Sequence, residues 1–177
     1  MFEALVEKKI RNIPDFPKPG IQFKDITPVL ADHLAFNAAL DWFSECLHEN
    51  GRPDVIAGIE SRGFIFGAAL ARQHQIAFIP VRKPGKLPYK TIKETYDLEY
   101  GSDSLEIHID ALKEGDNVVI IDDLLATGGT AAAAARLIKK AGANAIMGAF
   151  LIELKDLKGI DILKASGIKN IKTLVRY

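Results

Sequence analysis

Two adjacent acids followed by a short run of hydroxyl and glycine residues form the part of this sequence best suited to chemistry. Asp122 and Asp123 come directly after four β-branched residues, 118–121, and residues 126–130 read Ala-Thr-Gly-Gly-Thr. A glycine-rich loop that opens a helix presents backbone N–H groups to a phosphate, and its glycines permit close approach. The two acids would repel that phosphate, but they can accept hydrogen bonds from sugar hydroxyls or hold a hard cation through water. The string therefore indicates a ligand with a phosphate at one end and a diol beside it.

The alternative for a lone pair of acids or glycines is an acidic turn that caps an ordinary crossover helix. Residues 118–130 taken together are more specific than such a turn. They lack the lysine of a Walker loop and the glycine spacing of a dinucleotide-binding fold, so neither of those phosphate motifs accounts for them.

Two basic segments could hold a second, diphosphate-sized anion. Arg62 belongs to the string Glu-Ser-Arg-Gly-Phe at 60–64, directly after an expected strand, and its guanidinium can grip phosphate through paired hydrogen bonds. A weak surface salt bridge with Glu60 is the alternative. Residues 82–95 carry five basic side chains and no core pattern. Such a stretch is either a solvated loop or a lid that folds over a leaving group and excludes water.

The elements that must position these residues alternate between strands and helices. Apolar runs predict strands at 54–59, 76–81, 118–121, 145–152 and 171–175, and helical spacing predicts helices at 2–11, 32–49, 65–73, 131–140 and up to 165. A hairpin is expected from 96–100 and 104–109, whereas 13–20 and 82–95 are expected to lack regular structure. The order predicts an α/β fold with a mainly parallel, doubly wound sheet flanked by helices. Ligands of such sheets gather at the carboxyl ends of the strands, where all three candidate segments fall.

The composition narrows the class of protein. A chain of 177 residues is expected to form one domain with a real core. Lys plus Arg and Asp plus Glu both number 23, so we expect no nucleic-acid partner and no membrane partner. Cys46 is the single cysteine, which excludes an internal disulfide, and the amphipathic, acidic start is unlike a signal peptide. A cytoplasmic protein is therefore expected.

Residues 118–130 match the phosphoribosyl-pyrophosphate motif of the type I phosphoribosyltransferases, and the chain resembles that family nearly from end to end. Residues 16–26, 60–64, 82–88 and 98–101 extend the resemblance, and the strings 16–26, 60–64 and 98–101 resemble the branch that uses adenine. The resemblance implies the type I phosphoribosyltransferase fold over 1–177, with a small N-terminal base-binding hood at about 1–33 and a flexible lid loop and hairpin at about 82–101. It further implies a homodimer that, in purine salvage, transfers the phosphoribosyl group of phosphoribosyl pyrophosphate to adenine, giving AMP and pyrophosphate.

The same resemblance implies a role for individual residues of this sequence. Glu99 would be the catalytic acid–base group, although alternation alone makes it a solvent-facing strand acid. The adenine-binding residues would be Gln22, Phe23, Lys24 and Leu154, with Phe23 and Leu154 on opposite faces of the base. The pyrophosphate-binding residues would be Ser61, Arg62, Arg82, Lys83 and Lys86, with Arg82 reaching from a partner subunit. The ribose-phosphate-binding residues would be Asp122, Asp123, Ala126, Thr127, Gly128, Gly129 and Thr130.

The resemblance also implies magnesium, held by substrate and water near Asp122 and Asp123 rather than by direct protein ligands, and a cis peptide between Glu60 and Ser61. Three other functions remain open from the residues: a transferase for hypoxanthine, guanine or xanthine, a non-catalytic sensor of phosphoribosyl pyrophosphate, and a structural α/β domain. A sensor would need neither a lid nor a base pocket. The purine transferases would be told apart by the exocyclic groups at the edge of the base that each one binds.

Overall fold

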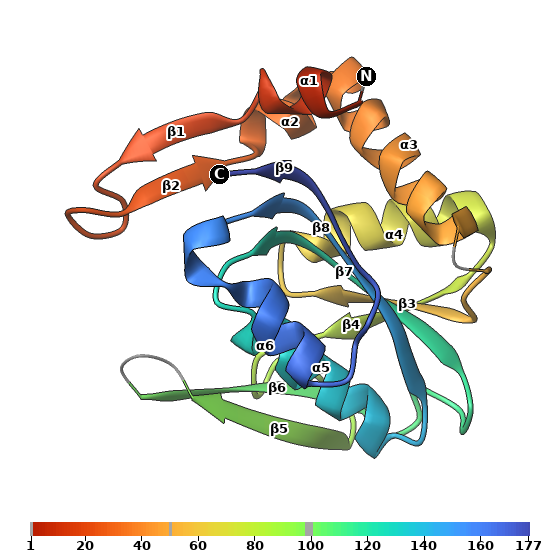
Figure 1. Cartoon of the computed structure of the whole chain (residues 1–177). Helices are drawn as coiled ribbons and strands as arrows, with labels where there is room; N and C mark the ends of the chain where they lie inside the picture. The colour runs from red at the N-terminus through yellow and green to blue at the C-terminus, as the bar shows by residue number, and fades with distance from the viewer. Residues whose placement is uncertain (1, 50, 98–100) are drawn as a thin grey trace. The chain divides into compact units, whose positions relative to one another are not determined.

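The computed structural model describes residues 2–49, 51–97 and 101–177 (Figure 1), and the chain divides into two compact units, Met1–Glu45 and Cys46–Tyr177. The first unit holds the following elements: α1 (Phe2–Glu7), β1 (Arg11–Pro14), β2 (Gln22–Asp25), α2 (Thr27–Ala31) and most of α3 (His33–Glu49). The second unit holds the remaining elements, among them a parallel sheet.

In the first unit, β1 pairs with β2 as an antiparallel hairpin in which Arg11 lies opposite Asp25. The Asp25 carboxylate accepts hydrogen bonds from the Thr27 hydroxyl at 2.6 Å, the Thr27 amide at 2.8 Å and the Arg11 guanidinium at 2.6 Å. These donors lower the pKa of Asp25 to about 2. Asp25 thus joins the hairpin to the first turn of α2.

Two sequence predictions about this unit were wrong. The helix expected over 2–11 ends at Glu7, and the segment 13–20, expected to be irregular, begins inside β1. Pro14 is accommodated because it is the last residue of a strand in a two-stranded sheet, where its missing N–H interrupts no ladder.

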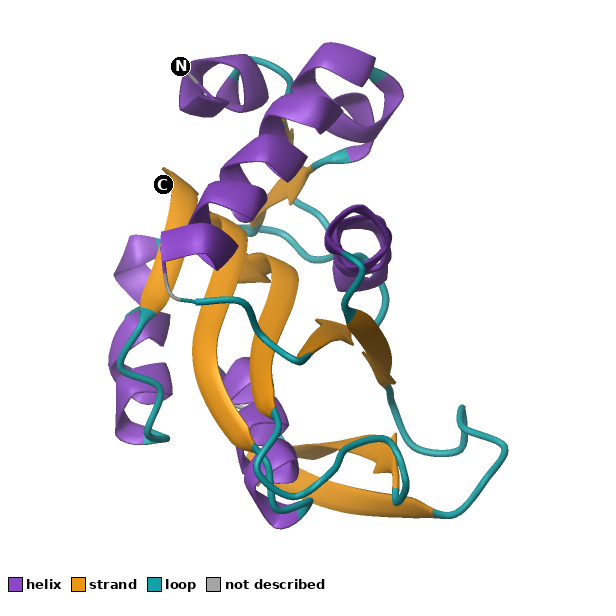
Figure 2. Cartoon of the chain, turned by 90° about the vertical axis from the view of Figure 1, so that its right-hand side faces the viewer, coloured by secondary structure: helices purple, strands orange, loops and turns teal. Residues whose placement is uncertain are grey.

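The second unit is built on a sheet with the order β4-β3-β7-β8-β9, five-stranded in the described part of the chain and parallel throughout. Its strands are β3 (Val55–Ile59), β4 (Ala77–Val81), β7 (Asn117–Leu125), β8 (Asn144–Glu153) and β9 (Ile171–Arg176). Figure 2 shows their pronounced twist. The crossovers contain α4 (Gly63–His74), α5 (Gly129–Lys140), and the short η1 (Lys155–Leu157) with α6 (Gly159–Ala165). The predicted α/β fold with a parallel sheet is confirmed.

Helices cover both faces of this sheet. Alternate residues of β3, such as Ala57 and Ile59, belong to the core cluster that contains α5. Ile56 points to the other face, where it lies beside Gly67 of α4. A side chain at Gly67 would meet the Phe78 ring at 2.9 Å, so α4 approaches the sheet closely only because this residue is glycine.

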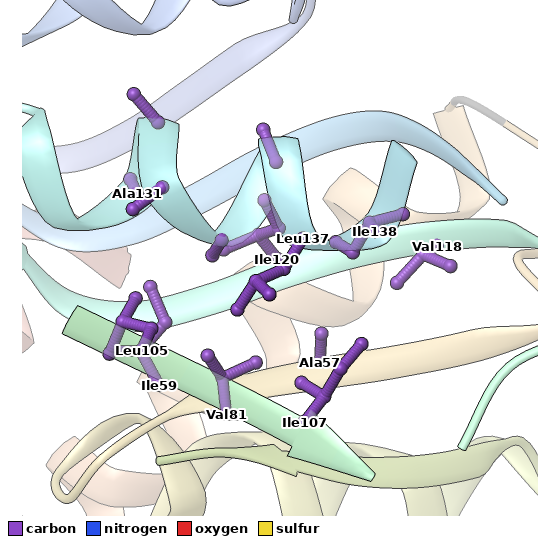
Figure 3. Close-up of a cluster of buried hydrophobic side chains, with 14 of the residues drawn as sticks. Ala57, Ile59, Val81, Leu105, Ile107, Val118, Ile120, Ala131, Leu137 and Ile138 are labelled. Carbon is purple, nitrogen blue, oxygen red and sulfur yellow. The ribbon is translucent and has the colours of Figure 1, made fainter. Parts of the chain in front are cut away.

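The core beneath the site combines the sheet, α5 and a hairpin (Figure 3). Leu105 and Ile107 of the hairpin are fully buried against sheet residues such as Val81, and each such burial stabilises the fold by roughly 1.5–3 kcal/mol. Residues 131–135 of α5 are all buried alanines. A helix enclosed on nearly all sides needs such small side chains, because α5 contacts the hairpin as well as the sheet.

The hairpin itself is longer than the sequence predicted. β5 (Thr91–Asp97) pairs antiparallel with β6 (Ser102–His108), so the segment 82–95, expected to lack structure, already contains the start of β5. Glu94 of β5 is held by Arg136 at 2.6 Å and by Lys140, both on α5. Because ion pairs partly hold this strand in place, its sequence lacks the regular alternation of apolar residues from which a strand is predicted.

The strand that leads to the acids is also longer than predicted. β7 runs to Leu125, so Asp122 and Asp123 lie within the strand rather than after it. Asp122 pairs with Phe150 of β8, and the pairing continues to Leu125. Among the described residues, no helix has the length and apolar character needed to cross a membrane.

Candidate active site

The carboxyl ends of β3, β4 and β7 surround a cavity of about 240 Å³ in the second unit. Its lining comprises Ile59, Glu60, Ser61, Arg62, Lys83, Asp122, Asp123, Leu124, Leu125, Ala126, Thr127, Gly128, Thr130 and Ala131. Segments from all three regions singled out in the sequence therefore meet at one place, as expected for ligand sites of parallel sheets.

Residues 126–130, here called the glycine loop, run from the end of β7 into the first two residues of α5. Gly128 has φ +82° and stands at the N-cap of α5, where no side chain caps the helix. The first N–H groups of a helix have no intrahelical partner, so this end of α5 can donate to an anion. Gly128 is also required by contact, because a Cβ there would lie 2.4 Å from the Gly159 carbonyl oxygen. Gly129 begins α5 and is the one predicted loop residue outside the cavity lining in the described chain.

Little positive charge offsets the neighbouring carboxylates of Asp122 and Asp123. The Asp123 amide donates to Asp122 Oδ1 at 2.9 Å, and Arg62 Nε lies 2.8 Å from Asp123 Oδ2. That contact does not have hydrogen-bond geometry, and Asp123 Oδ2 is buried without a hydrogen-bond donor among the described residues. Burial, and then the charge of Asp123, raise the pKa of Asp122; burial also raises the pKa of Asp123, against the opposing effect of Arg62. These carboxylates are suited to receive further donors or a cation.

The same carboxylates are oxygen ligands of the kind that magnesium prefers. Within the described residues, however, no group of three His, Cys, Asp or Glu side chains could hold a metal ion. The donor set therefore fits a cation that shares most of its coordination with a phosphate ligand and water.

The predicted pyrophosphate residues fall into two groups. Ser61, Arg62 and Lys83 line the cavity, and the peptide between Glu60 and Ser61 is cis, as the resemblance implied. Arg82 and Lys86 do not line it. Instead, Arg82 pairs with Glu60, Nε to Oε2 at 3.2 Å, and donates to the Lys86 carbonyl at 3.0 Å.

Glu60 was not predicted as a site residue, yet it organises this wall. Besides pairing with Arg82, its carboxylate accepts the Lys83 amide at 2.9 Å. These donors outweigh burial, which acts in the opposite direction, and lower the pKa of Glu60. Its position at the end of β3, inside a motif already singled out, was the signal that could have identified it.

The predicted base-binding residues belong to different units. Leu154 is half-buried in the second unit, and its amide donates to the Leu125 carbonyl at 3.0 Å, beside the glycine loop. In the first unit, Phe23 of β2 is half-buried, and its ring makes an edge-to-face contact with the ring of Phe16. The two ring centroids are 5.1 Å apart. The neighbours of Phe23 in β2 are Gln22, which accepts a hydrogen bond from Asn12, and Lys24. The predicted catalytic residue Glu99 lies outside the described residues.

Comparison with known proteins identifies the family. Residues 27–175 match the phosphoribosyl transferase domain family. The chain is 51% identical to an adenine phosphoribosyltransferase of Shewanella amazonensis over 169 residues, which cover 96% of this chain and 93% of that protein. The chain belongs to the adenine phosphoribosyltransferase family.

Solved structures of adenine phosphoribosyltransferases agree with this membership. The enzyme of Thermoanaerobacter pseudethanolicus superposes with a TM-score of 0.94 at 50% identity, covering all of both chains. That of Saccharomyces cerevisiae, complexed with an imino-altritol bisphosphate and adenine, superposes with a TM-score of 0.92 at 40% identity, covering 98% of each chain. The family resemblance and the fold predicted from the sequence are thus confirmed.

Proposed function

We propose that this protein is an adenine phosphoribosyltransferase of purine salvage, which converts adenine and phosphoribosyl pyrophosphate to AMP and pyrophosphate. The observation that carries the proposal is the composition of one cavity at the carboxyl edge of the sheet. It brings together a helix N-terminus with a glycine loop, two adjacent carboxylates, and the cations Arg62 and Lys83. The choice of adenine rests on the family membership.

The cavity offers a place for each part of phosphoribosyl pyrophosphate. The 5-phosphate would lie on the glycine loop, where backbone N–H groups and the helix dipole favour an anion. The ribose hydroxyls would donate to Asp122 and Asp123, supplying the donor that the buried Oδ2 of Asp123 lacks among the described residues. The pyrophosphate would face Ser61, Arg62 and Lys83, with Lys86 joining it from the segment that follows β4 and the partner subunit's Arg82 completing the set.

Adenine would be bound by the residues that the family motif assigns to the base. Phe23 and Leu154 would stack on the two faces of adenine, and the backbone at Gln22 and Lys24 would read its edge. Glu99 would take the imidazole-ring proton of adenine as that ring's nitrogen attacks the anomeric carbon. These roles follow from the family motif at matching positions.

Charge stabilisation would account for most of the catalysis. As the bond to pyrophosphate breaks, the anomeric carbon gains oxocarbenium character, so no covalent enzyme nucleophile is required. Magnesium, bound mainly by the diphosphate and water near Asp122 and Asp123, would neutralise charge on the leaving group. Arg62 and Lys83 would stabilise the departing pyrophosphate, and the glycine loop would fix the ribose in position.

A homodimer in the cytoplasm completes the proposal. Arg82 would act on the partner's site, as the resemblance to the family implies. A reducing compartment is supported by Cys46, which is buried as a free thiol.

The decisive experiment measures nucleotide formation from adenine, hypoxanthine, guanine and xanthine, each with phosphoribosyl pyrophosphate, with and without magnesium. We expect AMP from adenine in the presence of magnesium, little product from the other purines, and a large loss of activity with a chelator. Efficient use of hypoxanthine or guanine, or no product from any purine, would contradict the proposal.

A further inference from the structure

The hydroxyl of Tyr96 joins two ends of the candidate site. Tyr96 lies in β5, outside the cavity lining, and its side chain is buried. Its hydroxyl oxygen is 3.1 Å from Lys83 Nζ, 3.2 Å from Thr130 Oγ1 and 3.3 Å from Asp103 Oδ2. Lys83 and Thr130 both line the cavity, one on the proposed pyrophosphate side and the other on the glycine loop.

These three contacts use the full hydrogen-bonding capacity of the phenol. A tyrosine hydroxyl has one donor and two acceptor positions. Lys83 and Thr130 donate to it, and it donates to Asp103. The hydroxyl of Thr130, a residue expected to bind the ribose phosphate, therefore donates to Tyr96 in this structure.

Asp103 is brought to Lys83 by the register of the hairpin. It lies directly opposite Tyr96 in the β5–β6 pairing, so both side chains emerge on one face. Lys83 Nζ forms a short ion pair with Asp103 and lies 5.7 Å from the centre of the Tyr96 ring. Burial acts to lower the pKa of Lys83, but hydrogen bonds to Asp103 and Tyr96 outweigh it, and the pKa is raised. The ammonium is therefore charged at neutral pH.

We propose that Tyr96 and Asp103 are positioning residues that hold the Lys83 ammonium on the cavity wall before the diphosphate binds. Two of its three N–H groups are committed to Tyr96 and Asp103 within the described chain, which leaves the third for a phosphate oxygen. A lysine fixed in advance loses less side-chain freedom when the ligand arrives. This inference rests on the proposed function, in which Lys83 faces pyrophosphate.

Tyr96→Phe tests the inference because it keeps the buried ring and removes only the hydroxyl. We expect KM for phosphoribosyl pyrophosphate to rise about 10- to 150-fold, the loss typical of a hydrogen bond to a charged group. KM for adenine and kcat should stay within about twofold of wild type. Thr95→Val is the matched control, because it removes the hydroxyl of the neighbouring residue in β5. That hydroxyl is hydrogen-bonded to the Ser104 hydroxyl, with 3.0 Å between the two oxygen atoms. The control should leave all three constants unchanged.

A double-mutant cycle with Lys83→Met separates positioning from general structure. If Tyr96 acts through Lys83, Tyr96→Phe will cost nothing further in the Lys83→Met background. Equal costs in both backgrounds, or a Tyr96→Phe enzyme no different from the Thr95→Val control, would overturn the inference.

Calorimetric titration with magnesium pyrophosphate measures the same effect without turnover. We expect Tyr96→Phe to weaken pyrophosphate binding by a similar factor. A wild-type protein that binds pyrophosphate but makes no AMP would refute the proposed function and leave this inference standing on the titration. A wild-type protein that does not bind pyrophosphate would refute the inference itself.

Discussion

Gly159→Ala would insert a methyl group between α6 and the glycine loop. Gly159 is the buried first residue of α6, and a Cβ there would lie 2.2 Å from the Ala126 carbonyl oxygen and 3.0 Å from the Gly128 amide nitrogen. Both are backbone atoms, so no side-chain rotation can relieve the contact. Because ordinary contacts begin near 3.4 Å, the loop and the helix must separate by about 1 Å. Overpacking of this kind typically costs about 1–3 kcal/mol of stability.

The loss of ligand binding should be comparable to the loss of stability, because the displaced atoms carry the proposed phosphate site. A misplacement of about 1 Å can reduce activity by about a hundredfold. We therefore expect the Kd for ribose 5-phosphate, measured by calorimetry, to rise about 10- to 100-fold, while pyrophosphate binding changes little. Lys164→Ala, at an exposed position of the same helix, serves as the control. A Gly159→Ala protein that binds ribose 5-phosphate as tightly as wild type would refute the role assigned to the glycine loop.

Three further predictions concern the acidic residues Asp25, Asp122 and Glu99. Because Thr27 and Arg11 lower the pKa of Asp25, its ionised form stabilises the fold above the unfolded pKa near 4, and this contribution is lost as the pH falls toward 2. Asp25→Asn should thus cost about 1–2 kcal/mol in urea unfolding at pH 7, with the difference vanishing by about pH 2. The pKa of Asp122 is raised by folding, so its effect on stability has the opposite sign: the free energy of unfolding falls as the pH rises above the pKa that Asp122 has in the unfolded chain. Asp122→Asn should therefore raise Tm without ligand yet weaken ribose 5-phosphate binding. A lower Tm would contradict this. Glu99→Ala should lower kcat far more than it weakens binding of either substrate, and equal losses in steady-state kinetics and titration would remove Glu99 from catalysis.

The parallel sheet and the glycine loop could be predicted because their signals are local. The strand at 118–121 is a run of buried β-branched residues, and the acids, glycines and threonines that follow it are adjacent in the sequence. The loop-to-helix transition then follows from Gly128, whose positive φ few other residues adopt. Neighbouring residues suffice to specify such features.

Features that depend on distant partners could not be predicted in this way. The start of β5 is held by Glu94 through Arg136, which lies 42 residues further along the chain. Asp103 was expected in the turn of the hairpin, but pairing with Tyr96 places it in β6, beside Lys83. Similarly, a salt bridge between Arg62 and Glu60 was the alternative to a phosphate-binding role for Arg62. The structure instead pairs Arg62 with Asp123 and Arg82 with Glu60. Each of these ion pairs requires the folded arrangement of several strands.

A crystal structure with ribose 5-phosphate bound would test the central claim most directly. The proposed site predicts phosphate oxygens within hydrogen-bond distance of the backbone N–H groups of the glycine loop, and ribose hydroxyls on Asp122 and Asp123. A phosphate bound elsewhere, or a ribose turned away from both carboxylates, would contradict it.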